Sequence, residues 1–324
     1  MSVRSRRHFL RTSAAVAAIA AGAPAHSLAV SAFALPSGVA DRRPEGTALA
    51  LPQAMSLGLI VGLGKDPEAA IKKVHDLGVP TCQVGVDTFE PEIAAGLRSA
   101  LDKYGIEATS AVFGGPGPNV YDFYHGPETI GFVPRKYRAA RIAFAKKVSD
   151  FAKRVGIPAI QGHCGFIPEN PNDSLYKEAV QAFREVASYA KQNGQQFRYE
   201  TGQETPITML RAIDDVGLDN QGVNFDCANL IMYGKANPVD ALDVIGKHVQ
   251  GMHAKDGLYP TDPSKLGEEV AIGKGKVDFP TIFKKLRALN YQGAVTIERE
   301  ISGPQQLEDI RREKTYLEGL ISRT

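Results

Sequence analysis

Four short apolar segments in the second half of the chain each end in a residue that can hold a metal ion or transfer a proton: Glu200, Asp226, His253 and Glu298. Three carboxylates facing one axis would repel one another, and a buried carboxylate is costly unless it is paired or bound to a metal. A divalent cation removes the repulsion, and the neutral imidazole of His253 adds a nitrogen ligand. A single carboxylate in such a position often caps the following helix, but four consecutive segments with this ending favour one shared metal site.

The donor set of this candidate site indicates which metal it would hold. Three carboxylates with one imidazole nitrogen suit Mn²⁺, Mg²⁺ or Co²⁺, with Zn²⁺ as a further option. The set contains no Cys, which argues against a structural zinc site. We therefore expect one divalent ion, with Mn²⁺ as the first choice.

The apolar pattern of the chain indicates how these four residues are brought together. From Met55 onward, short apolar runs alternate with segments of helical period. Helices are expected at 67–77, 137–155, 174–192 and 280–289, and Gly residues that follow several of these segments favour a stop there. Strands are expected at 57–63, 81–86, 107–113, 159–164, 197–200, 222–226, 250–253 and 294–298.

Eight strand–helix units in about 270 residues match the count and length of a (β/α)₈ TIM barrel. Catalysis in that fold takes place at the C-terminal ends of the strands, where the four candidate ligands fall. The alternative is a doubly wound open sheet, but Gly58, Gly62 and Gly64 lack the spacing of its phosphate-binding fingerprint. We therefore expect a single-domain α/β barrel over residues 55–324.

Five fragments carry a resemblance to a known family. In their order and spacing, residues 55–320 resemble the xylose isomerase-like barrels, also called the sugar phosphate isomerase/epimerase or AP endonuclease family 2 superfamily. The resemblance implies that Glu200, Asp226, His253 and Glu298 are the metal ligands, and that Glu200 and Glu298 also form an acid/base pair. The fragments are Tyr199-Glu200-Thr201-Gly202-Gln203-Glu204, Asn224-Phe225-Asp226-Cys227-Ala228-Asn229-Leu230, His253-Ala254-Lys255-Asp256-Gly257, Gly273-Lys274-Gly275-Lys276-Val277-Asp278 and Thr296-Ile297-Glu298-Arg299-Glu300.

The resemblance implies an isomerase or epimerase that acts on a keto-sugar or keto-glycoside. A metal that binds the ketone and a neighbouring hydroxyl polarises the carbonyl and stabilises an enediolate. One Glu removes the proton on the carbon next to the carbonyl and the other returns it, so each must come within reach of that proton. Glu300 has the same strand parity as Glu298 and is its rival for the eighth-strand role.

Five residues are candidates for substrate contacts: His163, Asn229, Lys255, Asp256 and Tyr121. His163 ends the fourth expected strand, where a buried structural His is the alternative. Asn229 stands where family epimerases often have His, and Lys255 and Asp256 stand near the place of a family Arg. Tyr121 belongs to the long connection between the third strand and the next helix, which is rich in Gly, Pro and aromatic residues and has no helical period. Loops of this length are often functional.

Three other functions were compatible with the same barrel. A sugar dehydratase or 3-keto-glycoside lyase would expel a leaving group after the same proton removal. A non-catalytic sugar-binding barrel would bind without metal. The family's DNA-repair endonucleases need additional His and Glu ligands, and the chain has seven His in all, two of them (His8 and His26) near the N-terminus. The expected partner is therefore a small carbohydrate and not a nucleic acid.

The first 34 residues predict an export signal. Residues 5–11, Ser-Arg-Arg-His-Phe-Leu-Arg, have the twin-arginine pattern, and small-residue cleavage motifs follow an Ala-rich stretch. That stretch, 14–21, is far shorter than the roughly 20 residues needed to span a bilayer. Residues 35–54 would then be a linker. A periplasmic or otherwise exported enzyme more plausibly meets unphosphorylated substrates, because phosphorylated metabolites are scarce outside the cytoplasm.

Composition and charge set the remaining limits. The 324 residues carry a formal charge of +2, and four Arg without any acidic residue lie in 1–40, so the rest is slightly acidic. This balance argues against a nucleic-acid binder that works by bulk electrostatics. Three Cys exclude a disulfide-built scaffold and are expected to be small buried residues.

No later segment is long and apolar enough to span a membrane. The family resemblance implies a homodimer.

Overall fold

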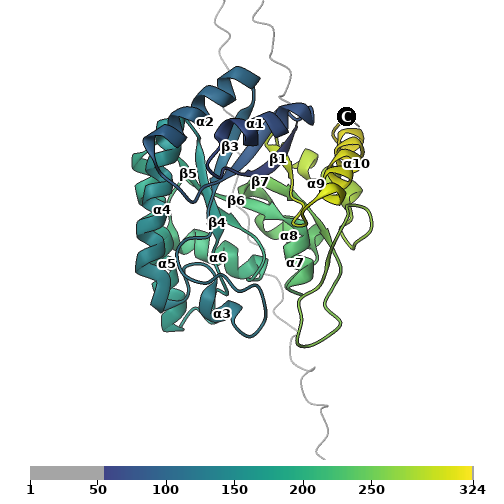
Figure 1. Ribbon diagram of the computed structural model, residues 1–324. Coiled ribbons are helices and arrows are strands. Elements are labelled where there is room, and N and C mark those ends of the chain that lie inside the picture. The colour runs from purple at the N-terminus through teal and green to yellow at the C-terminus, as the bar shows by residue number, and fades with distance from the viewer. Residues whose placement is uncertain (1–54, 323–324) are drawn as a thin grey trace, which may run out of the picture. The chain divides into compact units, whose positions relative to one another are not determined.

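The computed structural model describes residues 55–322 and shows a closed barrel of eight parallel strands surrounded by helices (Figure 1). The predicted export signal and linker lie outside the described residues. The strands close in the order β1-β10-β7-β6-β5-β4-β3-β2, which confirms the TIM barrel and excludes the open sheet. Their bounds are β1 Ser56–Gly62, β2 Thr81–Gly85, β3 Glu107–Val112, β4 Ala159–His163, β5 Gln196–Glu200, β6 Gln221–Asp226, β7 Val249–Ala254 and β10 Ala294–Ile297.

Helices cover the outside of the barrel, and one small antiparallel pair of strands lies outside the main sheet. That pair is β8 (Asp256–Gly257) with β9 (Glu269–Val270). None of the helices in the described part of the chain is long and apolar enough to cross a membrane. The helices are α1 Pro67–Asp76, α2 Pro91–Tyr104, α3 Gly126–Thr129, α4 Arg135–Val155, α5 Ser174–Gln192, α6 Pro206–Val216, α7 Cys227–Met232, α8 Pro238–Ile245, the 3₁₀ turn η1 Gly246–His248, α9 Phe279–Ala288 and α10 Pro304–Ile321.

Local sequence signals account for most of these boundaries. Each predicted strand agrees with the observed one to within one residue at either end. Asp66, Asp173 and Asp278 cap α1, α5 and α9 by accepting hydrogen bonds from backbone N–H groups of the first helical turn. Gly105 and Gly156 end α2 and α4 in the left-handed conformation, where a side chain would be strained. The three Cys are buried and free, as expected.

The two faces of the strands have different characters. Their outward-facing apolar side chains pack under the helices; α4, for example, buries Val148, Phe151 and Val155. The inward face is polar instead. Ser110 Oγ donates to Gln161 Oε1 at 2.7 Å, and Gln161 Nε2 donates to Gln83 Oε1 at 2.9 Å, both inside the barrel. The interior therefore contains a hydrogen-bond network beneath the C-terminal ends of the strands.

The long connection between β3 and α4 is ordered by one buried arginine. It contains a single helical turn, α3, that the sequence pattern did not predict. Arg141 of α4 is 1% exposed, and its guanidinium donates to carbonyl oxygens of Pro116, Pro118, Thr129 and Gly131 at 2.6–3.1 Å. A buried arginine can satisfy many backbone acceptors at once because it has five N–H donors. Arg141 thus fixes the loop that carries Tyr121.

Replacing Arg141 with Met should therefore destabilise the protein by about 3 kcal/mol or more, because several buried carbonyls lose a charged donor together. Urea unfolding of both proteins would measure the difference. Arg135→Met is the matched control, since Arg135 is exposed and pairs only at the surface with Glu178 and Ser174. That surface pairing should contribute under about 1 kcal/mol. Equal losses in the two variants would contradict the role given to Arg141.

Candidate active site

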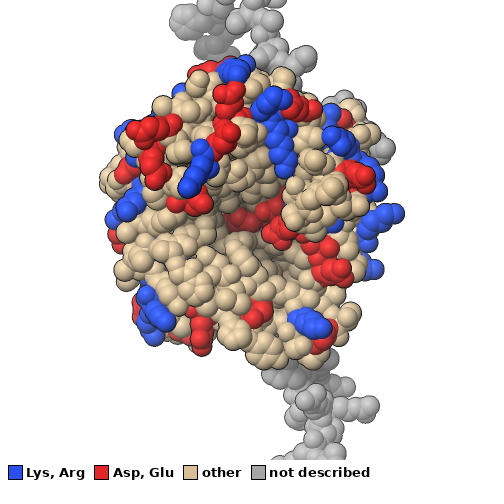
Figure 2. All heavy atoms as spheres, in the orientation of Figure 1, with Lys and Arg blue, Asp and Glu red and all other residues tan. Residues whose placement is uncertain are grey.

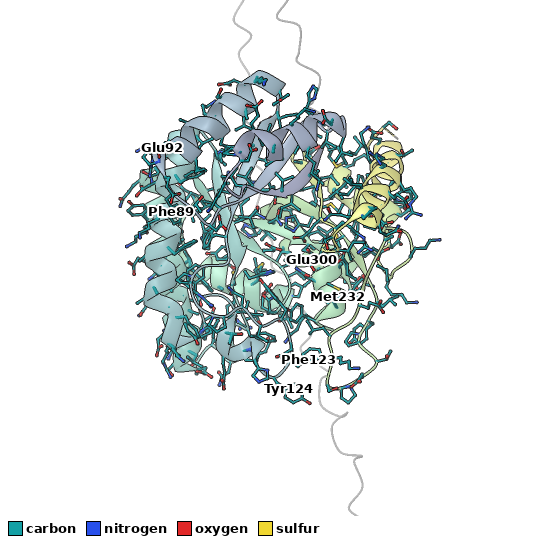
Figure 3. The ribbon with its side chains drawn as sticks, in the orientation of Figure 1. Phe89, Glu92, Phe123, Tyr124, Met232 and Glu300 are labelled. Atoms are coloured by element: carbon teal, nitrogen blue, oxygen red, sulfur yellow. The ribbon has the colours of Figure 1, made fainter. Side chains whose placement is uncertain are left out.

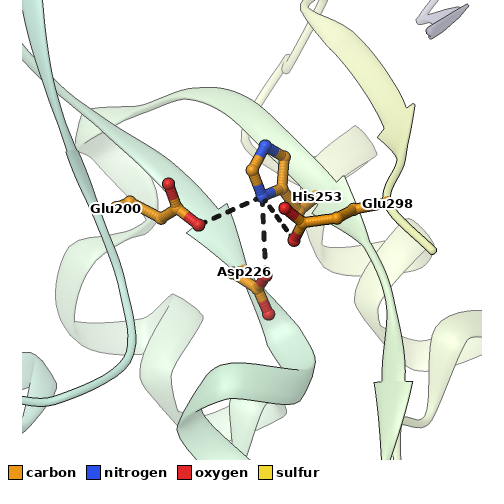
Figure 4. Close-up of side chains that lie close together, drawn as sticks. All are labelled: Glu200, Asp226, His253 and Glu298. Carbon is orange, nitrogen blue, oxygen red and sulfur yellow. Dashed lines mark ion pairs between the residues drawn. The ribbon is translucent and has the colours of Figure 1, made fainter. Parts of the chain in front are cut away.

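Four side chains meet at the C-terminal end of the barrel: Glu200 of β5, Asp226 of β6, His253 of β7 and Glu298 just after β10 (Figure 4). Their potential ligand atoms all lie within 4.8 Å of one another. His253 Nδ1 is 3.3 Å from Glu200 Oε1, 3.5 Å from Asp226 Oδ2 and 3.1 Å from Glu298 Oε2. We call these four residues the metal cluster.

Strand register brings the metal cluster together. Asp226 pairs directly with His253 across β6 and β7, and Glu200 pairs with Asn224 across β5 and β6. The backbone N–H of Glu298 donates to Ala254 O at 3.1 Å, which extends the β10–β7 pairing by one residue. Parallel strands place all their carboxyl ends at the same mouth of the barrel, so residues far apart in the sequence become neighbours.

The cluster has the donors that a divalent cation needs. Asp226 Oδ1 caps α7 by accepting a hydrogen bond from the Asn229 N–H at 2.7 Å. One of the two Asp226 oxygens therefore caps a helix, which was the alternative to metal binding for a single carboxylate at a strand end. The other oxygen, Oδ2, and His253 Nδ1 are buried and form no hydrogen bond within residues 55–322, although the Lys255 ammonium lies 3.1 Å from Oδ2. A carboxylate oxygen and a neutral imidazole nitrogen 3.5 Å apart are both acceptors, so a proton or a metal ion between them is favoured. Three carboxylates with one imidazole therefore fit a divalent ion.

The other ring nitrogen of His253 is held from inside the barrel. Gln83 Oε1, an acceptor, lies 2.7 Å from His253 Nε2 and favours a proton on that nitrogen, so that Nδ1 of the neutral ring can offer its lone pair to a metal ion. Sequence analysis did not identify Gln83. The only available signal was a polar residue in the middle of an otherwise apolar strand. Such an outer partner commonly fixes the tautomer and orientation of a ligating His.

Gln83→Leu should therefore weaken Mn²⁺ binding roughly 10- to 100-fold, because His253 loses the acceptor that orients its ring. Competition against a fluorescent chelator would give the affinity. Ser110→Ala is the control, since it removes a hydroxyl from the same interior network without touching His253. The role of Gln83 would be refuted if both variants bound Mn²⁺ with the wild-type affinity.

Charge in the cluster is balanced only in part by the protein itself. Burial opposes the ionised form of Glu298, but His253 and Lys255 overcome it and hold the pKa of Glu298 well below its usual range. Burial likewise disfavours protonation of His253, but Glu298 and Glu200 raise its pKa well above the ordinary value. The cluster thus binds positive charge strongly, whether as a proton or as a metal ion.

Lys255 and Glu300 lie beside the cluster. The Lys255 ammonium is buried, 2.8 Å from Glu298 Oε2, 3.1 Å from Asp226 Oδ2 and 3.4 Å from Glu300 Oε1. Lys255 therefore contacts two metal-cluster carboxylates, which the prediction of a substrate contact did not foresee. The Glu300 side chain, labelled in Figure 3, is 56% exposed and is not among the four clustered residues. The geometry therefore favours Glu298 for the eighth-strand role.

Two predicted substrate residues face the site. His163 Nε2 lies 3.7 Å from Glu200 Oε1, and the ring of Tyr121 meets the His163 ring edge at a centroid distance of 5.7 Å. Tyr121 is 51% exposed. Partial burial first, and then the negative charges of Glu200, Glu300 and Glu298, raise the pKa of Tyr121 to about 12. The long loop therefore does place an aromatic side chain over the mouth of the barrel.

The other two predicted substrate residues serve the protein's own backbone. Asn229 Nδ2 donates to Thr201 O at 3.3 Å. Both oxygens of Asp256 are used by a neighbouring turn, so its side chain is not free to bind substrate. The basic turn at 273–276 is folded around this carboxylate, as an internal anion site would be. The donors to Asp256 are the backbone N–H groups of Gly257, Gly273, Gly275 and Val277, at 2.8–3.1 Å.

Gln203, Glu204 and Tyr233 are further buried polar residues of this region that were not predicted. Burial raises the pKa of Glu204 to about 8. Gln203 and Glu204 could have been found from their place shortly after Glu200 in the sequence. Tyr233 follows an apolar helix, and no sequence signal marked it. Figure 2 shows that the face in view is hollowed at its centre, with acidic side chains inside the hollow.

Residues 71–320 match the family described as the xylose isomerase-like TIM barrel. The chain belongs to this family. Its fold is similar to that of a xylose isomerase domain protein from Planctomyces limnophilus, with a TM-score of 0.78 and 36% identity. That match covers 82% of this chain and 97% of the other chain.

Two further proteins are similar to this chain at lower identity. The apo 3-keto-D-glucoside 4-epimerase from E. coli has a TM-score of 0.62 and 17% identity, over 82% of this chain and 99% of that one. At this identity the likeness shows the fold alone. An uncharacterized protein of Methanocaldococcus jannaschii, MJ1311, is 28% identical over 169 residues, or 48% of this chain. This chain spans about half, 55%, of the length of that curated relative.

Proposed function

We propose that the protein is a divalent-metal-dependent isomerase or epimerase of a keto-sugar or keto-glycoside. The observation that carries the proposal is the arrangement of Glu200 and Glu298, two carboxylates that approach the same atom, His253 Nδ1, from β5 and from the end of β10 (Figure 4). Both belong to the metal cluster, and both face the open mouth of the barrel. A substrate between them would present its reacting carbon to a carboxylate on either side.

The chemistry needs one proton removed and one returned. A divalent ion held by Glu200, Asp226, His253 and Glu298 would polarise a carbonyl and stabilise negative charge on it. One of the two glutamates takes the proton from the carbon next to the carbonyl, and the resulting acid or its opposite partner returns a proton. Return to the opposite face of the same carbon gives an epimer, and return to the neighbouring carbon gives an isomer. Lys255 neutralises charge on Glu298 while this happens.

Mn²⁺ remains the proposed metal, with Mg²⁺, Co²⁺ and Zn²⁺ as alternatives, because the donor set has three carboxylates and one nitrogen. The keto-glycoside branch of the proposal is supported by the shared fold with a 3-keto-D-glucoside 4-epimerase. A homodimer stays a prediction from the family resemblance.

Solvent isotope exchange tests the proposal. The Mn²⁺-loaded protein is incubated in D₂O with a panel of neutral ketohexoses and methyl 3-keto-glycosides, and NMR follows each carbon-bound proton. We expect deuterium at the carbon next to the carbonyl, together with a new epimer or isomer. An unsaturated product or released aglycone would show a lyase instead. Metal-independent binding without any exchange would contradict the proposal and indicate a sugar-binding barrel.

We also propose that residues 1–34 direct export of the folded protein through the twin-arginine pathway. Replacing Arg6 and Arg7 together with Lys should retain the protein in the cytoplasm, because that pathway recognises the arginine pair and not charge alone. Cell fractionation and the mass of the exported protein would measure location and cleavage. The control replaces Arg4 and Arg11 with Lys. If both double variants were exported to the same extent, the pair would not be the signal.

A further inference from the structure

Three buried polar atoms close to the metal cluster have no hydrogen-bond partner among the residues that the structure describes: Gln203 Oε1, Glu204 Oε2 and Tyr233 Oη. Gln203 and Glu204 are each 1% exposed, and Tyr233 is 4% exposed. A buried polar atom without a partner destabilises the folded state, so most proteins hold very few of them. Three such atoms on neighbouring elements therefore point to a ligand that completes their hydrogen bonds.

A series of contacts joins these atoms to the proton-transfer groups. His163 Nε2 lies 3.7 Å from Glu200 Oε1, and His163 Nδ1 lies 3.4 Å from Gln203 Nε2. Burial raises the pKa of Tyr233, and the Gln203 amide partly offsets this rise, so the amide and the phenol are neighbours. The unpartnered atoms therefore lie next to the candidate active site, beyond Glu200 and His163.

Packing and a backbone hydrogen bond hold the Tyr233 ring in place. The Tyr233 ring meets the Phe166 ring edge to face, with centroids 5.8 Å apart and planes at 75°. Phe166 in turn packs so closely on Gly126 that a Cβ there would lie 2.7 Å from its ring. The backbone N–H of Tyr233 donates to Asn229 O at 2.9 Å. The hydroxyl is therefore oriented before any ligand binds, which lowers the entropy lost on binding.

We propose that Gln203 and Tyr233 bind the hydroxyl groups of an uncharged sugar on the side of Glu200 away from the metal cluster. Gln203 Oε1 accepts a hydrogen bond from one hydroxyl, and the Tyr233 hydroxyl both donates and accepts. The His163 ring, which contacts Tyr121, lies next to Gln203 in the same part of the site. The inference rests on the proposed function, because it names the substrate class of the same site.

The charges around the pair favour a neutral ligand over a phosphate ester. The carboxylates of Glu200, Asp226 and Glu298 form the metal cluster, and Glu300 lies beside it, 3.4 Å from the Lys255 ammonium. The buried cation of the site, Lys255, is already paired with Asp226, Glu298 and Glu300. Another lysine, Lys235, has its ammonium over the Phe166 ring at 5.4 Å. A dianionic group would therefore enter a region that carries more acidic than basic groups.

Binding measurements test the pair without turnover. Isothermal titration of the Mn²⁺-loaded protein uses D-fructose, methyl 3-keto-glucoside and D-fructose 6-phosphate. We expect at least one neutral probe to bind, with the phosphate ester at least tenfold weaker than D-fructose. Tyr233→Phe and Gln203→Met should each weaken the best neutral probe about tenfold, since each removes about one hydrogen bond. Tyr259→Phe is the control, because Tyr259 is 56% exposed and its hydroxyl donates a long hydrogen bond to Gly234 O, at 3.4 Å.

Three binding results would contradict the proposed role of Gln203 and Tyr233. It is overturned if the two variants bind neutral probes like the control, if the phosphate ester binds as tightly as D-fructose, or if no neutral probe binds. Metal content and melting temperature of each variant exclude loss of the cluster or of the fold as the cause. Failure of the proposed function is distinguishable. In that case the variants still weaken binding tenfold, but the wild type exchanges no deuterium into any probe.

Discussion

Glu298→Gln and Glu200→Gln should each lower the rate of deuterium uptake into the substrate by about a thousandfold or more, within the range that a positioned acid or base contributes. An amide has the size of the carboxylate but cannot accept the proton. Exchange NMR of a substrate found in the panel measures the rate. Because both residues also belong to the metal cluster, the metal content of each variant must be measured alongside.

Glu300→Gln separates the two candidates on the eighth strand. Its side chain is half exposed and lies outside the metal cluster, so the exchange rate should fall less than tenfold. The two-base mechanism would be wrong if Glu200→Gln and Glu298→Gln both kept full exchange while they held metal. A larger loss in Glu300→Gln than in Glu298→Gln would transfer the catalytic role to Glu300.

Removal of the metal is the second change with a large expected effect. Exhaustive chelation should abolish exchange and also destabilise the barrel, because three carboxylates then face one another with only His253 and Lys255 to compensate. A ligand present at 100 times its Kd stabilises the folded state by about 2.7 kcal/mol. For a domain of this size that corresponds to a melting temperature higher by roughly 5–10 °C. Differential scanning calorimetry with and without Mn²⁺ measures the shift.

A substitution of one metal-binding residue shows whether Mn²⁺ stabilises the protein by binding to the metal cluster. Asp226→Asn removes one negative charge from the cluster and should largely eliminate the stabilisation by Mn²⁺. Asp262→Asn, in an exposed turn, is the matched control and should keep it. Undiminished exchange in protein shown by elemental analysis to be free of metal would rule out the metal-dependent mechanism. So would equal Mn²⁺ stabilisation in the two variants.

Much of the fold could be read from local patterns. Alternating apolar runs and helical periods, with Gly stops, predicted all eight strands of the barrel, because each of these signals lies within a short segment of the chain. The strand-end positions of Glu200, Asp226 and His253 followed directly, since a parallel barrel gathers the carboxyl ends of its strands. The single turn α3 was missed because four residues are too few to show a helical period.

Interactions between distant segments decided the rest of the site. Side chains alternate between the two faces of a strand, so the sequence made Glu298 and Glu300 equally good candidates for the metal cluster. In the structure β10 ends at Ile297 and the chain then turns away, so that only Glu298 of the two lies in the cluster. Lys255 and Asp256 are adjacent in the sequence, yet one contacts the metal cluster and the other holds the 273–277 turn.

The sequence by itself determined the barrel and the residue types at the end of each strand, because period and capping are properties of short segments. Only the tertiary structure decided that Gln83 orients His253 and that Gln203 and Tyr233 lie near each other beside Glu200. The physical reason is that hydrogen-bond partners and unpaired buried atoms depend on where side chains from separate strands meet. That meeting is set by register, closure of the barrel and the packing of its loops.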